Sequence, residues 1–368
     1  MIEIPVELGP RRYPILVGRG LALVLPDLLE WARGRKTVVV SSRRVWAMHG
    51  ARLGRALRRW ADPDPILLPD GERHKNRRAL EALHDRFLDA GLRRDSLVVA
   101  VGGGVVGDVT GFAAATYMRG MSWAVVPTTL LSMVDSAIGG KVGINHPKAK
   151  NLIGAFHQPR AVVSDPAFLD TLPPREVRSG AYEVLKCGIL ADRALFGAMQ
   201  AAPTGLLGWQ GIEVESAIAS ASRIKAEIVE KDERERGLRR VLNLGHTIGH
   251  ALEAVTRYRR FTHGEAVGWG LVGAAWIARR RGMVSESGFD AIASAVDRVG
   301  SRPRVSDLSS ADILLAASRD KKARAGKVPF ILPAGIGRVV TRDDVTPAEI
   351  RHALRVMAGR EALLSGVG

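Results

Sequence analysis

The stretch Leu97–Arg119, LVVAVGGGVVGDVTGFAAATYMR, constrains the fold of this chain more than any other. Leu97–Val101 is a short apolar run, mostly of β-branched residues, which is typical of a buried strand. Three glycines at 102–104 follow, where the backbone turns sharply, and a helix of small residues is predicted over Val109–Tyr117. A strand, a glycine turn and a helix direct free backbone N–H groups and the helix dipole at a phosphate. The spacing differs from GxGxxG, so an ordinary tight turn is the alternative interpretation.

Short strands alternate with helices on both sides of this stretch, which favours an open, mainly parallel sheet. The predicted strands are Ile2–Leu8 and Tyr13–Val17, which we expect to pair, then Thr37–Ser41, Ile66–Leu68, Leu97–Val101, Trp123–Val126 and Ala161–Ser164. The predicted helices among them, apart from the one after the glycines, are Ala51–Trp60 and Ala79–Ala90.

Paired prolines at 173 and 174 indicate a domain boundary, because proline interrupts both helices and strands. Beyond them the apolar residues repeat at helical spacing, apart from a short extended piece near Val328–Leu332. The helices expected there are Arg175–Ile189, Ile212–Glu230, Gly245–Val255, Glu265–Arg281, Phe289–Val299, Ala311–Ser318 and one near Pro347–Met357. We therefore expect an N-terminal Rossmann-like α/β domain over residues 1–172 and an all-helical C-terminal domain over residues 173–368.

Composition excludes several functional classes. The single cysteine, Cys187, rules out a disulfide framework, and the chain has neither a signal peptide nor an apolar run of membrane-spanning length, so we expect a cytoplasmic protein. A net charge of +16 suggests nucleic-acid binding, but the basic residues are dispersed and only 5% of residues are aromatic. We expect no nucleic-acid partner and interpret the charge as an arginine-rich surface that attracts anionic small substrates.

The segment 132–151 is dense in polar groups on a predicted loop after a sheet strand. Asp135, Lys141, Lys150 and Asn151 lie within 17 residues of one another and are candidate ligand contacts, with a solvated surface loop as the alternative. Asparagine is rare in this chain, and only positions 76, 145, 151 and 243 carry it.

Acids and histidines at helical spacing mark the C-terminal half. Glu183 and Lys186 are three residues apart in apolar company, so a buried pair there needs a partner or a metal. His246 and His250 are four apart on one face, which is a known spacing for a metal pair, and His263 follows at the start of the next helix. The histidines, with Glu183 on another helix, are candidates for a two-histidine, one-glutamate site with open positions.

These motifs resemble the 3-dehydroquinate synthase family of sugar-phosphate cyclases, nearly from end to end. The resemblance rests on GERHK at 71–75, GGGVVGDVTGFAAATYMRG, VPTTLLSMVDSAIGGKVGIN, KNLIGAFHQP, EVLK, DERERGLRRVLNLGHTIGHALE, HGEAV and DKK at 320–322. It implies an NAD- and metal-dependent carbon–oxygen lyase of the shikimate pathway, which makes the precursor of aromatic amino acids. Its substrate is 3-deoxy-D-arabino-heptulosonate 7-phosphate, which undergoes transient oxidation by NAD, β-elimination of phosphate, reduction and aldol closure to 3-dehydroquinate.

For the cofactor, the resemblance implies NAD contacts on and around the glycine turn. They come from Ser42, Arg44, Glu72, Lys75, Gly103, Gly104, Val105, Asp108, Thr128, Thr129, Lys150, Phe168 and Thr171. The family often has an acid and an asparagine where this chain has Ser42 and Arg44. An arginine there tolerates a 2′-phosphate, so the preference for NAD over NADP is left open.

For the metal, zinc as a rule and cobalt as an alternative, the resemblance implies Glu183, His246 and His263 as ligands, where spacing alone favours His246 with His250. The residues implied in substrate binding are Arg119, Asp135, Lys141, Asn151, Glu183, Lys186, Lys225, Arg239, Asn243, His246, His250 and one of Lys321 and Lys322. The residues implied in catalysis are Glu235, as proton acceptor, His250, Lys141, Arg239 and Asn243. Arg119 is expected to reach the substrate of a neighbouring subunit, which implies a homodimer.

Two other functions are weighed against this one. The first is another sugar-phosphate cyclase, against which the combination of Arg239, Asn243 and His250 argues. The second is a metal-dependent polyol dehydrogenase. A polyol has no phosphate, so the lysines of the implied substrate site argue against it.

Overall fold

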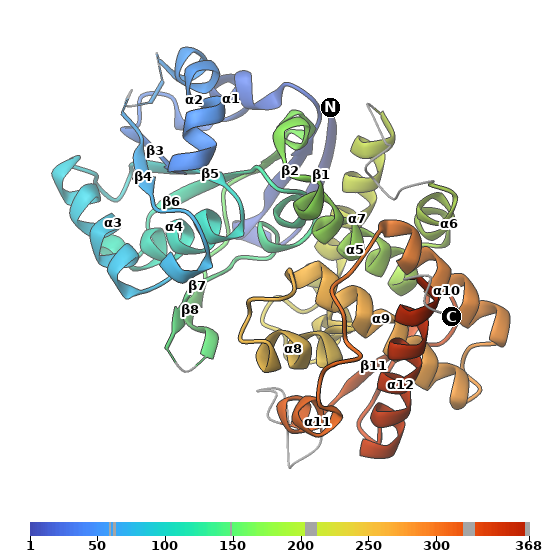
Figure 1. Ribbon diagram of the computed structural model, residues 1–368. Helices are drawn as coiled ribbons and strands as arrows, with labels where there is room; N and C mark the ends of the chain where they lie inside the picture. The colour runs from blue at the N-terminus through green and yellow to red at the C-terminus, as the bar shows by residue number, and fades with distance from the viewer. Residues whose placement is uncertain (59, 62–63, 148, 203–211, 319–327, 365–368) are drawn as a thin grey trace. The chain divides into compact units, whose positions relative to one another are not determined.

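The computed structural model describes residues 1–58, 60–61, 64–147, 149–202, 212–318 and 328–364 of the chain (Figure 1). They form two compact units. The first contains the described residues of Met1–Leu172 and Gly211–Arg234, and the second contains those of Pro173–Gln210 and Glu235–Gly368. Among the described residues, no helix has the length and apolar character needed to cross a membrane.

The first unit is built on a seven-stranded sheet in the order β1-β2-β9-β6-β5-β3-β4. Its strands are β1 (Ile2–Val6), β2 (Tyr13–Val17), β3 (Thr37–Ser42), β4 (Ile66–Leu68), β5 (Leu97–Gly102), β6 (Ser122–Pro127) and β9 (Val162–Ser164). All neighbours are parallel except β1 and β2, which pair antiparallel at the edge. This confirms the predicted Rossmann-like, mainly parallel sheet, including its antiparallel start.

The burial of the central strands explains why their continuous apolar runs predicted them. Every residue of β3 and β5 is buried, as expected for parallel strands covered on both faces. The helices of this unit are α1 (Leu25–Leu28), α2 (Arg43–Leu57), α3 (Arg77–Asp89), α4 (Gly104–Thr116) and α7 (Ile212–Lys231). Helix α4 packs on β5 and β6, and it begins five residues before the predicted start because its first turn contains glycine.

The segment 132–151 is more ordered than the predicted loop. Its first part, Ser132–Ser136, is a turn of π-helix, and the rest enters an antiparallel pair of β7 (Lys141–His146) and β8 (Ala149–Phe156). Gly143 lies opposite Gly154 in this pair, and a Cβ on Gly143 would lie 2.5 Å from a backbone oxygen. The two strands therefore approach too closely there to admit side chains. Because glycine is needed at both positions, the sequence lacks the alternating pattern that predicts a strand.

Helix α7 belongs to the first unit, which differs from the continuous second domain expected over residues 173–368. It packs on β1 and β2 and on the π-helical turn, where the Ser222 hydroxyl donates to the carbonyl of Met133. Helical periodicity places a helix here but does not say which core its apolar face covers.

The second unit is mainly helical. Its helices are α5 (Pro174–Ala191), α6 (Arg193–Ala201), α8 (His246–Val255), α9 (His263–Arg280), α10 (Glu286–Val299), α11 (Ser310–Ser318) and α12 (Pro347–Leu364). It also holds an antiparallel pair, β11 (Phe330–Pro333) with β12 (Val339–Arg342), so the predicted helical domain is mainly but not entirely helical. The short extended piece predicted near Val328–Leu332 is one strand of that pair.

Candidate active site

The glycine turn of the first unit joins β5 to α4. Gly103 is the N-cap of α4, and no side chain caps the helix, so no capping side chain covers the N–H groups of the first turn, a feature of helix starts that bind phosphates. Neighbouring side chains crowd the turn: a Cβ on Gly103 would lie 3.1 Å from Thr129, and one on Gly104 would lie 3.0 Å from Ser136. Thr128 follows β6, and its N–H donates to the carbonyl of Gly102 at 3.0 Å. Five of the predicted cofactor residues are thus brought together: Gly103, Gly104, Val105 in the first turn of α4, Thr128 and Thr129.

A polar network lies beside this turn and centres on Lys75. Its ammonium is buried, forms an ion pair with Asp108 on α4 and donates to the side chain of Asn151. Burial raises the pKa of Asp108, while the Lys75 charge opposes that rise. The network includes Asn145, which sequence reasoning missed as a site residue: its side chain donates to Glu72 at 2.7 Å and accepts from the Asn151 N–H at 2.9 Å. The rarity of asparagine in this chain was the available signal.

A second cluster in the same unit forms around the π-helical turn. Lys225 on α7 binds both the carboxylate and the backbone carbonyl of Asp135. Lys141, at the exposed start of β7, lines a pocket together with Gly104, Asp108 and Ser136. The pocket therefore joins the glycine turn to a predicted substrate lysine within one unit.

The carboxyl end of β3 brings a third group of predicted cofactor residues together. The Ser42 hydroxyl caps α2 by accepting from the Val45 N–H at 3.3 Å, and the Arg44 N–H donates to Asp70 at 3.2 Å. Nearby, His49 on α2 contacts both predicted residues of the turn Pro166–Thr171. Its ring lies 4.9 Å from that of Phe168, and its Nε2 lies 3.0 Å from the hydroxyl of Thr171. Burial lowers the pKa of His49, and nothing in the sequence marked this histidine as a neighbour of the site.

Arg119 is not brought to the glycine turn. It is exposed at the opposite end of α4, about 20 Å along a helix of 13 residues. Arg119 and its neighbour Met118 both have positive φ, at 66° and 49°. Asn151 and Glu235 share this unfavourable backbone region, so three predicted site residues sit in strained conformations, which cluster at functional sites. Lys150 lies on β8, half-buried.

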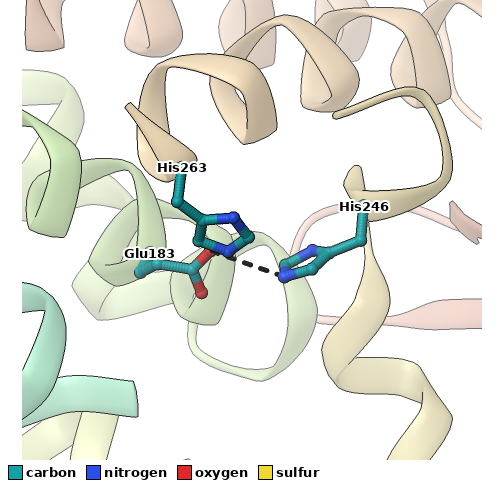
Figure 2. Close-up of side chains that lie close together, drawn as sticks. All are labelled: Glu183, His246 and His263. Carbon is teal, nitrogen blue, oxygen red and sulfur yellow. Dashed lines mark ion pairs between the residues drawn. The ribbon is translucent and has the colours of Figure 1, made fainter. Parts of the chain in front are cut away.

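In the second unit, three predicted metal ligands from three helices converge (Figure 2). Glu183 lies on α5, His246 begins α8 and His263 begins α9. The Nε2 atoms of both histidines lie 3.7 Å from the same Glu183 oxygen, and one potential ligand atom of each residue lies within 4.8 Å of the others. Both imidazole rings point at the carboxylate, which leaves a position for one cation among three protein ligands.

Local structure fixes the start of α9 against α5. Thr262 and Glu265 form a capping box around His263, and the Glu265 carboxylate accepts two bonds from Arg175 in the first turn of α5, at 2.8 and 2.7 Å. The N–H of Gly264 donates to the Ser179 hydroxyl, and a Cβ on Gly264 would lie 1.9 Å from the Ser179 carbonyl oxygen. His263 and Glu183 are therefore held close because α9 begins in direct backbone contact with α5.

The chemistry of Glu183 fits a bound cation. Its side chain is 1% exposed. Its Oε2 forms an ion pair with Lys186, while its Oε1 faces the two histidines and accepts no hydrogen bond from the described residues. A buried carboxylate with open lone pairs is costly unless a charge or a metal compensates it. Two imidazole nitrogens and one carboxylate oxygen form a ligand set that suits zinc or cobalt.

Of the remaining predicted residues of this unit, His250 lies beside the ligands, and Glu235, Asn243 and Arg239 lie on or against one 3-10 helix. The His250 ring packs 5.3 Å from that of His246 and 6.0 Å from that of His263, beside the ligand group. The Asn243 amide donates to Glu235 at 3.1 Å, and Arg239 is buried on the same 3-10 helix as Asn243. Lys321 and Lys322 lie outside the described residues.

Solved structures share this two-unit fold. A 2-epi-5-epi-valiolone synthase from Streptomyces hygroscopicus subsp. jinggangensis, with NAD⁺ and Zn²⁺ bound, is 27% identical, has a TM-score of 0.85 and covers 98% of this chain and 99% of its own. A 2-deoxy-scyllo-inosose synthase with carbaglucose-6-phosphate, NAD⁺ and Co²⁺ is 25% identical, with a TM-score of 0.84 and coverages of 96% and 99%. A probable glycerol dehydrogenase from Sinorhizobium meliloti, 16% identical with a TM-score of 0.65, covers 94% and 96% and shares the fold alone. The fold class is that of the sugar-phosphate cyclases.

Sequence comparison identifies the family within that class. Models of the 3-dehydroquinate synthase N-terminal and C-terminal domains match residues 65–179 and 180–323. The 3-dehydroquinate synthase of Pelotomaculum thermopropionicum is 44% identical over 346 residues, 93% of each chain, and that of Acidithiobacillus ferrooxidans is 44% identical over 360 residues, 96% of this chain and 98% of its own. The chain belongs to the 3-dehydroquinate synthase family.

Proposed function

We propose that this protein is the lyase that converts 3-deoxy-D-arabino-heptulosonate 7-phosphate to 3-dehydroquinate and phosphate, with NAD as a recycled catalyst and zinc or cobalt as the metal. The observation that supports it most is the group of Glu183, His246 and the half-buried His263 beside Lys186, in a chain of this family. When bound, NAD would accept and return a hydride, and the metal would stabilise an alkoxide developing on the substrate. Glu183 and the two histidines would hold that metal.

The anionic substrate explains the buried lysines. The phosphate and carboxylate of a heptulosonate phosphate need several cations, and we assign that role to Lys141, Lys186, Lys225 and Arg239. Lys186 and Lys225 are almost fully buried, and each forms an ion pair, with Glu183 and Asp135 respectively, because a buried charge is costly without an opposite charge beside it. A substrate phosphate then meets ammonium groups that are already oriented.

Proton transfer is assigned to two residues of the second unit. His250 lies beside both histidine ligands without joining their group, so it can exchange a proton without losing a metal bond. We assign Glu235 as the proton acceptor, and its carboxylate accepts a hydrogen bond from Asn243 while its backbone has a positive φ. Asn243 thus acts by positioning Glu235.

The glycine turn and the Lys75 network are proposed to bind NAD, with the pyrophosphate at the start of α4. NAD is favoured over NADP, because the Asp70 carboxylate lies at the start of α2, where it accepts a hydrogen bond from the backbone N–H of Arg44. A negative charge there accepts ribose hydroxyls and repels a 2′-phosphate. We further infer that the protein acts as a cytoplasmic homodimer, with the exposed, strained Arg119 reaching the partner's substrate.

A comparison of three separate substrates tests this proposal against its alternatives. The protein, loaded with zinc and NAD, is incubated separately with the heptulosonate phosphate, with glucose 6-phosphate and with glycerol. We expect phosphate and a carbocyclic product from the first substrate alone. Turnover of glucose 6-phosphate instead would assign another sugar-phosphate cyclase, and NADH formation from glycerol would assign a polyol dehydrogenase.

A further inference from the structure

Glu253 is a buried acid with no assigned role in the proposed reaction. It lies on α8, two turns after His246, and is 5% exposed. Its Oε2 atom lies 3.2 Å from Nδ1 of His263, on the side of the ring opposite the metal group. The His263 ring therefore connects two carboxylates, because its Nε2 faces Glu183 at 3.7 Å.

This geometry fixes the tautomer of the imidazole. A neutral histidine carries one proton, so a ring that donates from Nδ1 to a carboxylate presents the lone pair of Nε2 to a cation. Metal-bound histidines are commonly oriented in this way through their second nitrogen. His246 has the same arrangement with a weaker acceptor, since its Nδ1 lies 3.1 Å from the carbonyl oxygen of Leu244.

We propose that Glu253 is a positioning residue, which orients His263 and raises its basicity so that the Glu183 group binds its metal tightly. The proposal rests on the metal site of the proposed function. Glu253 is also near enough to His250 and His263 to belong to a second possible ligand set. The Glu183 set is favoured because both Nε2 atoms converge on one oxygen of Glu183, whose lone pairs accept no hydrogen bond from the described residues.

Metal binding by the metal-free protein measures this role without any turnover. The affinity for Zn²⁺ is obtained by competition with a chromophoric chelator, and the visible d–d absorption of bound Co²⁺ reports the ligand geometry. For Glu253→Gln we expect a loss of Zn²⁺ affinity of about 10- to 100-fold and an altered Co²⁺ spectrum, with a metal still bound. In Glu253→Asp the side chain is one methylene shorter, so its carboxylate does not reach the His263 ring and Zn²⁺ affinity should also fall. This variant replaces Glu253→Gln in the test if Glu253→Gln does not fold.

Glu349→Gln is the matched control, because Glu349 is a paired acid on α12 whose hydrogen bonds go to Arg281 and Thr346. It should keep wild-type Zn²⁺ affinity even where its thermal stability falls. Unchanged affinity in both Glu253 variants would overturn the proposal. Complete loss of metal, as expected for Glu183→Gln, would also overturn it by making Glu253 a ligand. A wild-type protein that binds no metal would instead refute the proposed function.

Discussion

The substitution Lys75→Met tests the polar network beside the glycine turn. It removes the cation but keeps most of the side-chain volume, and it leaves the Asp108 carboxylate without its ion pair. The Lys75 side chain is 5% exposed and that of Asp108 is 18% exposed. Breaking a buried pair costs about 3–5 kcal/mol, and the partial exposure of Asp108 places this case near about 3 kcal/mol. That is a large share of a typical free energy of unfolding of about 5–15 kcal/mol.

The loss should depend on pH. Burial raises the pKa of Asp108 in the folded protein above its unfolded value. The stability that this group contributes is therefore fully present below the unfolded pKa and is lost as the pH rises through the folded pKa. Without Lys75, which lowers this pKa, the folded value rises further. The deficit of the variant relative to wild type should thus be small in acid and grow towards neutral pH.

Urea unfolding of the metal-free and NAD-free protein, followed by circular dichroism, measures both effects. With a slope of about 2–3 kcal/mol per molar urea, the midpoint of the first unit should fall by about 1 M near pH 7 and by much less near pH 4. The double variant Lys75→Met, Asp108→Asn is the control, because it leaves no buried charge and should recover about 2 kcal/mol relative to the sum of the single variants. A deficit that is the same at both pH values, or fully additive losses, would refute the assignment of a buried, coupled pair.

Two further predictions concern the metal and the dimer. Glu183→Ala should lose bound metal and activity together, whereas His250→Ala should keep the metal and lose activity. Metal analysis of the purified variants measures this. Loss of metal in His250→Ala would support His246 and His250 as the metal pair that spacing favours. Arg119→Ala should raise the KM for substrate and leave zinc content unchanged, because only an anion contact is lost. Mixed dimers of Arg119→Ala with His250→Ala should be more active than either parent, because one site then carries neither lesion. If subunits exchange without any recovery, Arg119 does not act across an interface.

Much of the first unit could be predicted because its signals are local. Continuous apolar runs predict β3, β5 and β6, and the glycines after β5 predict the turn. The β7–β8 pair could not be predicted, since Gly143 and Gly154 matter only as opposite positions in a pairing that the sequence does not display. Helical spacing likewise predicts α7 but does not indicate that this helix packs in the first unit, because that packing depends on residues distant in the sequence.

The ligand group shows the same limit. Spacing of four residues correctly places His246 and His250 in contact on one helix. The further histidine ligand, His263, comes from another helix. Its distance to Glu183 depends on the backbone contact of Gly264 with Ser179. Only a resemblance to a known family could name that ligand set from the sequence. Asn145 and Glu253 were missed because the side chains they contact, Glu72 and His263, lie on other elements whose packing the sequence does not display.

The central claim is that NAD is a catalyst in this protein and is not consumed. The most direct measurement supplies the zinc-loaded enzyme with excess heptulosonate phosphate and a known, much smaller amount of NAD, and follows phosphate release and absorbance from NADH together. The account predicts many phosphates released per NAD, with no net accumulation of NADH. Phosphate release that stops when the NAD is exhausted, with one NADH formed per turnover, would contradict it.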